Sequence, residues 1–366
     1  MIFINSLGIY VHIPFCATKC PYCDFYSQQF SKKIENDYVQ QVICDIMRYK
    51  NKGYTADTLY FGGGTPNLIS PYSIGAIIDA VKDVFKLSGE ISIEANPRLI
   101  TLEKIKILQQ YGVNRVSVGM QSAVETELAA LGRHHTAIDV FNAVGIVKSA
   151  GINNISLDMM LGVPYQTMSS VDTTISFIGE LDVKHVSAYI LTVEENTPFY
   201  QSEIITHCPS EDEVAKIYLH TIKKLGSIGF NQYEISNFSK VGYESIHNLK
   251  YWQSKNYLGF GASAHSFING KRYAYPNSTT EYINKPKWIC TDSSCDEYTE
   301  YVMLGLRLTQ GINTEYIKSH FGISKDKLFN TAKPLQALGL INIVGDNIFL
   351  TPQGFLVSNS IIVQFI

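Results

Sequence analysis

The 366-residue sequence has few of the features that mark secreted, membrane or nucleic-acid-binding proteins. Seven cysteines are too few for a disulfide-stapled secreted domain, and no apolar run is as long as a membrane span. Lysine and arginine number 30 against 33 acidic residues, so no overall basic field attracts nucleic acid. Met1–Leu7 lacks the basic start of a secretion signal and resembles the lead-in to a strand. We therefore expect a cytoplasmic protein without a transmembrane segment or a nucleic-acid partner.

Three of the cysteines nevertheless stand close together. Cys16, Cys20 and Cys23 have the spacing C-x3-C-x2-C directly after an apolar, strand-like run at residues 9–13. A structural zinc site would need four ligands, usually as two C-x2-C pairs, and no second pair follows. Three thiolates on one loop can hold three corners of a 4Fe–4S cluster and leave the fourth iron open to a small molecule. We predict such a cluster here.

Strand-like and helical segments alternate from the N-terminus to about residue 235. The expected strands are residues 7–13, 58–61, 91–94, 115–119, 155–160 and 185–190. Helical patterns follow them, and six successive strand–helix units predict a parallel sheet with right-handed crossovers. A full barrel of this kind has eight units, so we expect an α/β fold with a partial, open (β/α)6 barrel. An ordinary doubly wound sheet is the alternative.

The pattern changes after Ser236. Residues 259–262 and 273–277 are typical of loops and hairpins, and residues 298–308 are helical. Two helical patterns and a strand-like run follow, which predicts a small α+β appendage similar to a winged helix. We therefore divide the chain into a barrel domain, residues 1–236, and a C-terminal domain, residues 237–366.

Polar residues and glycines gather at the ends of the expected strands, where open parallel sheets bind ligands. Gly62–Gly64 follows the second strand and allows a close backbone approach. Glu94 ends the third strand and could accept two ribose hydroxyls; the alternative is a solvated loop residue. Gln121 ends the fourth strand, and Arg133 follows it with a fork suited to a carboxylate. Asp158 stands in an apolar strand, so we expect a ligand or a buried polar network around it.

Together these segments resemble the radical S-adenosylmethionine (SAM) superfamily and, within it, the oxygen-independent coproporphyrinogen oxidase family, more closely its HemW branch. The matching segments are residues 10–16, 61–66, 93–97, 119–122, 131–133, 157–164, 303–307 and 338–340. The resemblance implies that SAM binds the open iron and is cleaved to a 5′-deoxyadenosyl radical with an electron from a donor protein. It also implies the residues that contact SAM: Tyr10, Gly63, Gly64, Thr65, Glu94, Gln121, Arg133 and Asp158.

Two features favour the HemW branch over the true oxidases. In the family resemblance, the oxidases have the cysteine motif C-x3-C-x2-C-x-C. Phe25 stands here in place of the fourth cysteine. They also carry a longer N-terminal extension, whereas this chain enters its first strand almost at once. The resemblance to HemW implies a chaperone that binds haem and delivers it to an acceptor protein. The alternatives are an oxidase that decarboxylates two propionates of coproporphyrinogen III and a radical SAM enzyme for another tetrapyrrole.

Histidines offer candidates for the haem ligand. His247 opens the segment His247–Trp252, which matches the H-N-x-x-Y-W motif of the HemW branch. Histidine supplies an axial nitrogen to haem iron, although a lone histidine is also typical of a core or capping position. His265 is the second candidate. His134 and His135, which follow Arg133, are expected to line the SAM pocket or to be solvated.

Overall fold

The six expected strands form the middle of one twelve-stranded sheet. In sheet order they are β1 (Leu7–Ile13), β4 (Ala56–Gly63), β5 (Glu90–Ala95), β6 (Arg115–Gln121), β7 (Asn154–Leu161) and β8 (His185–Ile190). Each neighbouring pair among them is parallel. The computed structural model describes residues 6–366, so Met1–Asn5 of the predicted lead-in lie outside the described residues.

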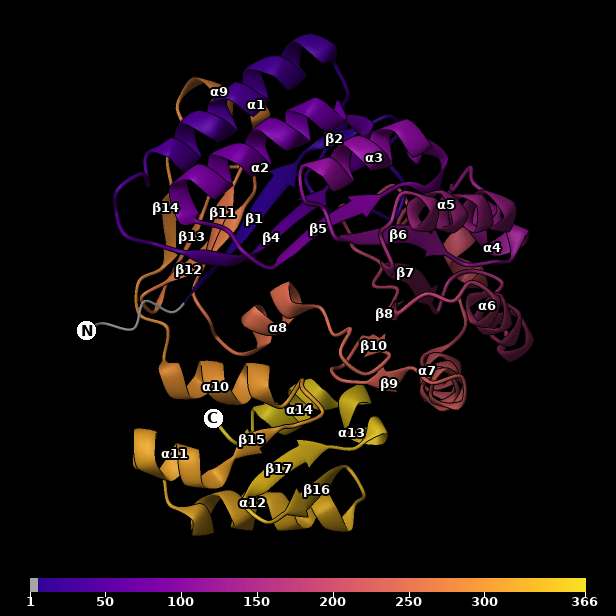
Figure 1. Cartoon of the computed structure of the whole chain (residues 1–366). Helices are drawn as coiled ribbons and strands as arrows, with labels where there is room; N and C mark the ends of the chain where they lie inside the picture. The colour runs from indigo at the N-terminus through magenta and orange to yellow at the C-terminus, as the bar shows by residue number, and fades with distance from the viewer. Residues whose placement is uncertain (1–5) are drawn as a thin grey trace.

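Helices connect these strands along the outer side of the curved sheet (Figure 1). They are α1 (Lys32–Met47), α2 (Pro71–Phe85), α3 (Leu102–Gln110), α4 (Glu125–Ala130), α5 (Ala137–Ser149), α6 (Met168–Glu180) and α7 (Glu211–Ser227). Side chains cap several of their N-termini, as Ser70 does for α2 and as the capping boxes at Thr136 and Ser210 do for α5 and α7. The predicted (β/α)6 architecture is therefore confirmed.

Strands from later in the chain extend the sheet at both edges. Antiparallel to β8 lies β10 (Asn237–Ser239), followed by β9 (Asn231–Gln232). At the other edge β11 (Tyr257–Phe260) pairs in parallel with β1. Three antiparallel strands continue from it: β12 (His265–Ile268), β13 (Lys271–Ala274) and β14 (Ile289–Asp292). The sheet thus continues past residue 236, where we drew the domain boundary.

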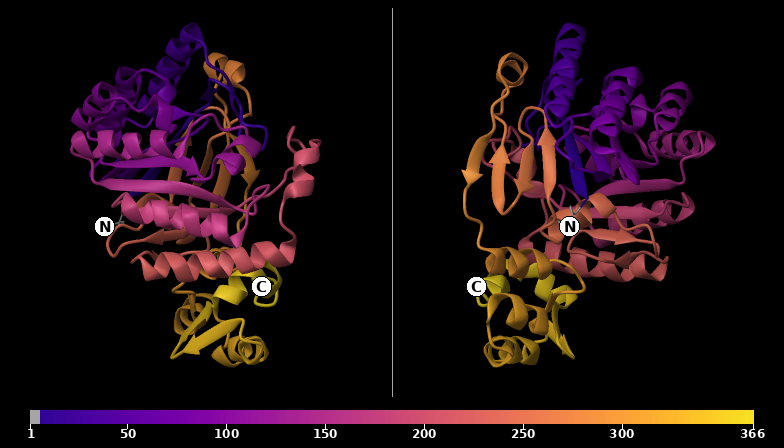
Figure 2. Two further views of the ribbon diagram at one scale, coloured as in Figure 1. Left: turned by 90° about the vertical axis from the view of Figure 1, so that its right-hand side faces the viewer. Right: turned by 60° about the vertical axis from the view of Figure 1, so that its left-hand side comes forward.

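The C-terminal segment forms a separate α+β lobe beneath the sheet in both views of Figure 2. Its sheet order is β15-β17-β16, from β15 (Ile312–Asn313), β16 (Ile341–Val344) and β17 (Asn347–Leu350). Its helices are α10 (Glu297–Gly305), α11 (Thr314–Phe321), α12 (Lys325–Ala337), α13 (Pro352–Leu356) and α14 (Ser358–Ile362). This order of a short strand, two helices and a β-hairpin confirms the predicted winged-helix-like appendage.

Two short helices link the parts of the molecule. Helix α8 (Ile246–Trp252) contacts β4 of the barrel and α10 of the lobe, and Figure 1 shows it between them. Helix α9 (Thr279–Asn284) packs on α1. A backbone bridge between Glu234 and Leu308 adds a further connection from barrel to lobe. The lobe is therefore joined to the barrel through α8 and through the Glu234–Leu308 bridge.

Side chains alternate along the barrel strands between an apolar core and a polar interior. On β6, Val116, Val118 and Met120 belong to the main apolar core. The residues between them line a cavity inside the sheet: Arg115, Ser117, Gly119 and Gln121. Successive side chains of a strand point to opposite faces, so this two-residue period separates the core from the cavity.

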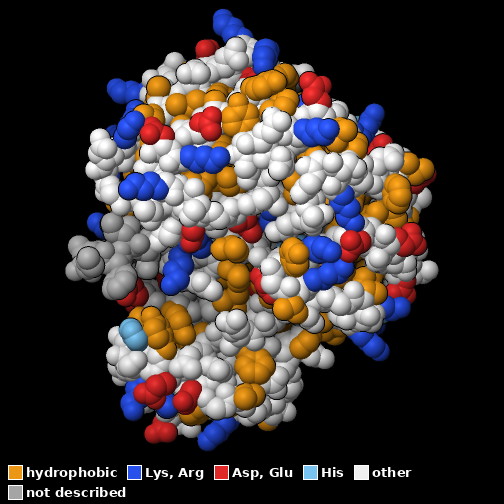
Figure 3. Space-filling model, in the orientation of Figure 1, with side chains coloured by type: hydrophobic (Ala, Val, Ile, Leu, Met, Phe, Trp, Pro, Cys, Tyr) orange, Lys and Arg blue, Asp and Glu red, His pale blue; other side chains and the backbone are white. Residues whose placement is uncertain are grey.

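The surface carries both signs of charge. On the face shown in Figure 3, lysine and arginine side chains are interspersed with aspartate and glutamate, and neither sign gathers into one field. Among residues 6–366 there is no helix whose length and apolar character would let it cross a bilayer.

Gly259 in β11 tests the packing of the sheet edge. A Cβ there would lie 2.1 Å from the carbonyl oxygen of His265 and 3.1 Å from Ala264 Cβ. Relieving this overlap would push β11 away from the turn that follows it. We expect Gly259→Ala to lower the free energy of unfolding by about 2–3 kcal/mol, measured by urea denaturation.

Gly145→Ala is the matched control. Gly145 lies within α5, and its added Cβ would meet no atom within 4 Å. Alanine is favoured over glycine inside a helix by about 1 kcal/mol, so this variant should be as stable as the parent or more so. Equal stability of the two variants would contradict the packing described for β11.

Candidate functional site

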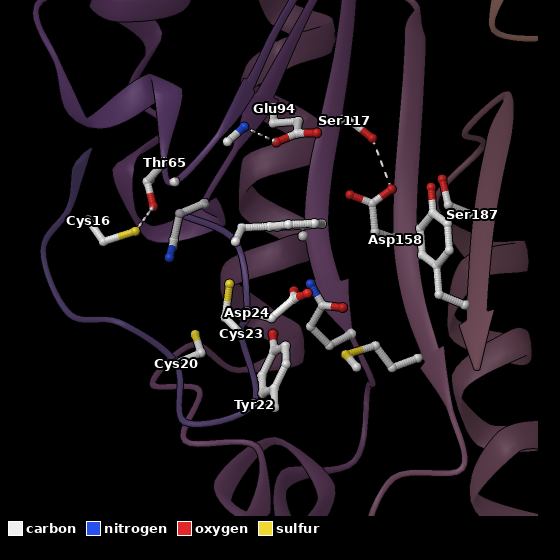
Figure 4. Close-up of a pocket in the computed structure, with 18 of the residues that line it drawn as sticks. Cys16, Cys20, Tyr22, Cys23, Asp24, Thr65, Glu94, Ser117, Asp158 and Ser187 are labelled. Atoms are coloured by element: carbon white, nitrogen blue, oxygen red, sulfur yellow. Dashed lines mark hydrogen bonds between the residues drawn. The ribbon is translucent and has the colours of Figure 1, made fainter. Parts of the chain in front are cut away.

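A cavity of about 560 Å³ opens at the carboxyl ends of the barrel strands (Figure 4). One side is the loop that follows β1, and the other is formed by the ends of β4–β8. The cavity is lined by all the predicted cluster and SAM residues except one: Cys16, Cys20, Cys23, Gly63, Gly64, Thr65, Glu94, Gln121, Arg133 and Asp158. Tyr10 and the predicted haem ligand His247 are not among its lining residues.

The cysteine loop is held by a short strand pair and by contacts with the glycine turn. β2 (Phe15–Cys16) pairs with β3 (Gln28–Gln29), so the loop returns to where it began. A Cβ on Gly64 would lie 2.8 Å from the carbonyl oxygen of Phe15 and 3.0 Å from Cys16 Sγ. Glycine is therefore required where the turn after β4 meets the loop.

Hydrogen-bond donors point at two of the three sulfurs. Thr65 Oγ1 donates to Cys16 Sγ at 3.7 Å, and Arg133 Nη1 donates to Cys20 Sγ at 3.4 Å. Figure 4 shows Cys16, Cys20 and Cys23 along the same side of the cavity. The thiolate is the form of cysteine that binds metals, and both donors are placed to hydrogen-bond to it.

The donor set fits an iron–sulfur cluster with one open corner. All three cysteines are free, half-buried thiols. Within residues 6–366 no three His, Cys, Asp or Glu side chains are placed to hold a single metal ion. Three soft thiolates on one side of an open cavity suit a cluster that needs three protein ligands and leaves room for a further ligand.

Two carboxylates form the opposite part of the cavity wall. Glu94 accepts hydrogen bonds from Tyr60 Oη at 3.0 Å and from the Gly63 N–H at 3.2 Å. Asp158 accepts one from Ser117 Oγ at 2.9 Å, as Figure 4 shows. Burial, and then the charge of Asp158, raises the pKa of Glu94 to about 7. Burial also raises the pKa of Asp158. The two acids are thus placed to accept hydrogen bonds from ligand hydroxyl or amino groups.

His247 lies in α8, behind the cavity wall. Its side chain is 1% exposed, its Nδ1 is 2.8 Å from Thr58 Oγ1, and its Nε2 is 2.7 Å from Tyr251 Oη. The ring also stacks on Tyr60, with 5.2 Å between ring centroids. In this arrangement neither ring nitrogen is available to iron. The next residue, Asn248, does line the cavity.

The remaining sequence-predicted residues also lie outside the cavity lining. The hydroxyl of Tyr10 is 3.0 Å from His12 Nδ1, behind the glycine turn. His265 and His134 are exposed, whereas His135 is buried with its Nε2 2.8 Å from the carbonyl oxygen of Met120. These placements give His135 a structural role.

Sequence reasoning missed several polar residues of the cavity. They lie on the inner faces of β4, β6 and β8: Tyr60, Arg115, Ser117, Ser187 and Tyr189. The available signal was their alternation with apolar residues, as in the run from Arg115 to Gln121. A polar inner face inside a barrel is costly unless a ligand or water satisfies it, so these positions mark a binding cavity.

The raised pKa of Glu94 predicts that the charged carboxylate lowers the stability of the folded protein at high pH. The folded protein holds this proton up to about pH 7, whereas the ordinary value is 4.5, so stability is lost as the pH rises through this window. Glu94→Gln has no such charge to bury. We expect it to raise the free energy of unfolding of the ligand-free protein at pH 8 by up to about 3 kcal/mol, and by far less at pH 5.

Urea denaturation at both pH values measures this difference. Glu103→Gln is the matched control, because Glu103 is exposed on α3. It should change stability little and equally at the two pH values. If the Glu94→Gln protein had the same free energy of unfolding as the parent at pH 8, the buried charge of Glu94 would not be destabilising and the prediction would be wrong.

The comparisons with known proteins cover the whole chain. A profile of the Radical SAM superfamily matches residues 10–178, and one of the HemN C-terminal domain matches residues 293–357. The chain is 36% identical to Heme chaperone HemW of Bacillus subtilis, covering 98% of each protein. It is 30% identical to Heme chaperone HemW of Escherichia coli, covering 100% of each.

A solved structure supports the fold. The radical SAM enzyme coproporphyrinogen III oxidase (HemN) from Escherichia coli superimposes with a TM-score of 0.82 at 21% identity. The match covers 98% of this chain and 90% of that one. From the full-length identity to its relatives, this chain belongs to the HemW family of the radical SAM superfamily.

Proposed function

We propose that this protein is a haem chaperone that holds a 4Fe–4S cluster and SAM in the cavity and delivers haem to an acceptor protein. The relatives that share its full length carry the name Heme chaperone HemW. The observation that carries the proposal is the shared cavity at the strand ends. Its lining contains three thiols and two carboxylates. It also contains further polar side chains on β6 and β8 that are not part of the predicted cluster and SAM sites.

The residues divide the cavity by chemistry. Cys16, Cys20 and Cys23 would hold the cluster, which supplies an open iron and an electron when it is bound. Gly63 and Gly64 offer backbone groups close to that corner, while Glu94 and Asp158 accept hydrogen bonds from SAM. Arg133 is placed between the thiols and β6, where it donates to Cys20 Sγ and to the carbonyl oxygen of Gly119. The thiols require a reducing compartment, so we place the protein in the cytoplasm with an electron donor protein as partner.

The haem ligand stays a proposal of its own. Ligation of iron through one ring nitrogen of His247 breaks the hydrogen bond at that nitrogen, because each nitrogen lies within 2.8 Å of a hydroxyl oxygen. Ligation through Nδ1 therefore requires α8 to move away from Thr58. Ligation through Nε2 requires Tyr251 to change its rotamer. His265 is exposed on β12 and needs no such change.

Oxidation of coproporphyrinogen III is the second candidate, because the fold is that of HemN. Phe25 weighs against it. The phenyl ring is 64% exposed and lines the cavity, in the place where the resemblance implies a cysteine in the oxidases. An apolar ring supplies a surface for a flat ligand and no thiol chemistry.

The cluster assignment predicts which cysteines matter. Anaerobic reconstitution should give about four irons per chain, as a cubane cluster requires. Alanine at Cys16, Cys20 or Cys23 should abolish the cluster, because each removes one of three ligands. Iron and sulfide analysis with the visible absorption spectrum measures this. Cys44→Ala is the control, since Cys44 is exposed on α1 and should load fully. Full iron loading of the Cys20→Ala protein would refute the assignment.

The chaperone and oxidase candidates predict opposite products. The reconstituted protein should bind haem with a shifted Soret band. It should form no protoporphyrinogen IX from coproporphyrinogen III in the presence of SAM and a reductant, whereas HemN assayed in parallel should form it. Steady conversion by this protein would overturn the chaperone proposal, and so would a failure to bind haem.

A further inference from the structure

Arg115 stands at the floor of the cavity. It is the first residue of β6, and Gln121 at the other end of the strand lies at the mouth. A strand rises roughly 3.3 Å per residue, so about 20 Å of strand separates the two positions. The Arg115 side chain is 2% exposed and shares the inner face of β6 with Ser117.

The guanidinium of Arg115 has no partner among the described residues. It makes no ion pair within 4.0 Å and no side-chain hydrogen bond to residues 6–366, and its Nε is buried without an acceptor. A buried charge is normally paired, because desolvation of an ionised group is costly. An acceptor from outside the chain would therefore lower the free energy of this position.

The two acidic residues whose charges act on Arg115 accept hydrogen bonds from other groups. Glu90 accepts the backbone N–H groups of Ile246 at 3.3 Å and His247 at 3.2 Å, at the start of α8. Asp158 accepts from Ser117. Burial lowers the pKa of Arg115, but the charge of Glu90 and then the neighbouring tyrosines and Asp158 outweigh it, so the guanidinium stays protonated.

Two histidines beside the floor are neutral. His185 lies between Ser156 Oγ at 2.7 Å and Tyr233 Oη at 2.8 Å, and burial holds its pKa well below the usual range. Burial, and then the charge of Lys250, lowers the pKa of His247 to about 3. Among the described residues that line the cavity, Arg115 is thus the cation at the floor, while Lys19 and Arg133 lie at the thiol side.

We propose that Arg115 binds a carboxylate of a ligand on the β6–β8 side of the cavity; resting on the proposed function, this is a propionate of haem. A guanidinium binds a carboxylate through two parallel hydrogen bonds, and a fully buried fork makes that pairing specific. The Asn248 amide lines the same cavity and can add a donor.

The rim of the cavity fits the rest of such a ligand. Tyr189 and Ile190, at the end of β8, are 42% and 39% exposed, and Phe25 on the cysteine loop is also exposed. All three line the cavity. Large apolar side chains open to solvent suit the flat face of a macrocycle. A ligand with an apolar plate at this rim and an acidic arm directed toward Arg115 would use both parts of the cavity lining.

The test compares haem with haem dimethyl ester, in which both propionates are blocked. The probes are titrated by Soret absorbance into the reconstituted full chain, as wild type, Arg115→Gln and Arg115→Met. Wild type should bind haem about tenfold to a hundredfold more tightly than the ester, and both variants should lose this preference. Arg98→Gln, which removes an exposed arginine, should behave as wild type. SAM binding and iron content should stay unchanged in the Arg115 variants.

A purely structural role for Arg115 predicts that its replacement lowers the unfolding midpoint of the ligand-free protein. We expect the opposite, because removal of an unpaired buried charge should leave that midpoint the same or higher. The inference is overturned if wild type binds the ester as tightly as haem, if Arg115→Gln binds haem as wild type does, or if that variant loses SAM instead. Absence of haem binding by wild type would overturn the proposed function and this inference with it. Haem binding that ignores Arg115 would overturn the inference alone.

Discussion

The two-residue period of the six parallel barrel strands is the constraint on which the rest of the structure depends. On β6, Val116, Val118 and Met120 fill the core beneath the helices, while Arg115 and Ser117 face inward. The same period on β7 places Leu157 and Met159 in the core and Asp158 in the cavity. Apolar burial therefore stabilises the sheet from outside, and the inner face stays available for polar chemistry.

This division also explains why the cavity has two ends of different character. The thiol end is built from loop residues beyond the strands, where glycine at position 64 lets the backbone approach Cys16. The floor is built from strand residues whose positions are fixed by the sheet, including Arg115 and Ser117. Helix α8 closes the floor from below and is itself held by Glu90. A movement of the C-terminal lobe that displaced α8 would therefore alter the floor of the cavity.

The sequence was sufficient to predict the architecture, because its local signals for helices and strands agree with the fold. Capping residues such as Ser70 and Thr136 mark the helix starts, and the apolar strands with intervening helices lead to a parallel sheet. The cysteine loop and the strand-end residues do share one cavity, although their binding roles stay predictions. The boundary at residue 236 also stays a prediction, and the sheet crosses it because β10–β14 pair with both edges. No local pattern reports such long-range pairing.

His247 and Arg115 show what sequence patterns leave out. The motif around His247 suggests a ligand, but only the packed structure reveals that hydroxyls occupy both ring nitrogens. Arg115 begins an expected strand, and its burial without a partner depends on side chains from distant parts of the chain. Burial and pairing are tertiary properties, so they had to be read from the structure.

A crystal structure of the anaerobically reconstituted protein with SAM and haem tests the central claim most directly. The account predicts a cluster on Cys16, Cys20 and Cys23, SAM against Glu94 and Asp158, and a haem propionate within hydrogen-bond distance of the Arg115 guanidinium. Haem bound on the outer surface, with the cavity floor holding only water, would contradict it.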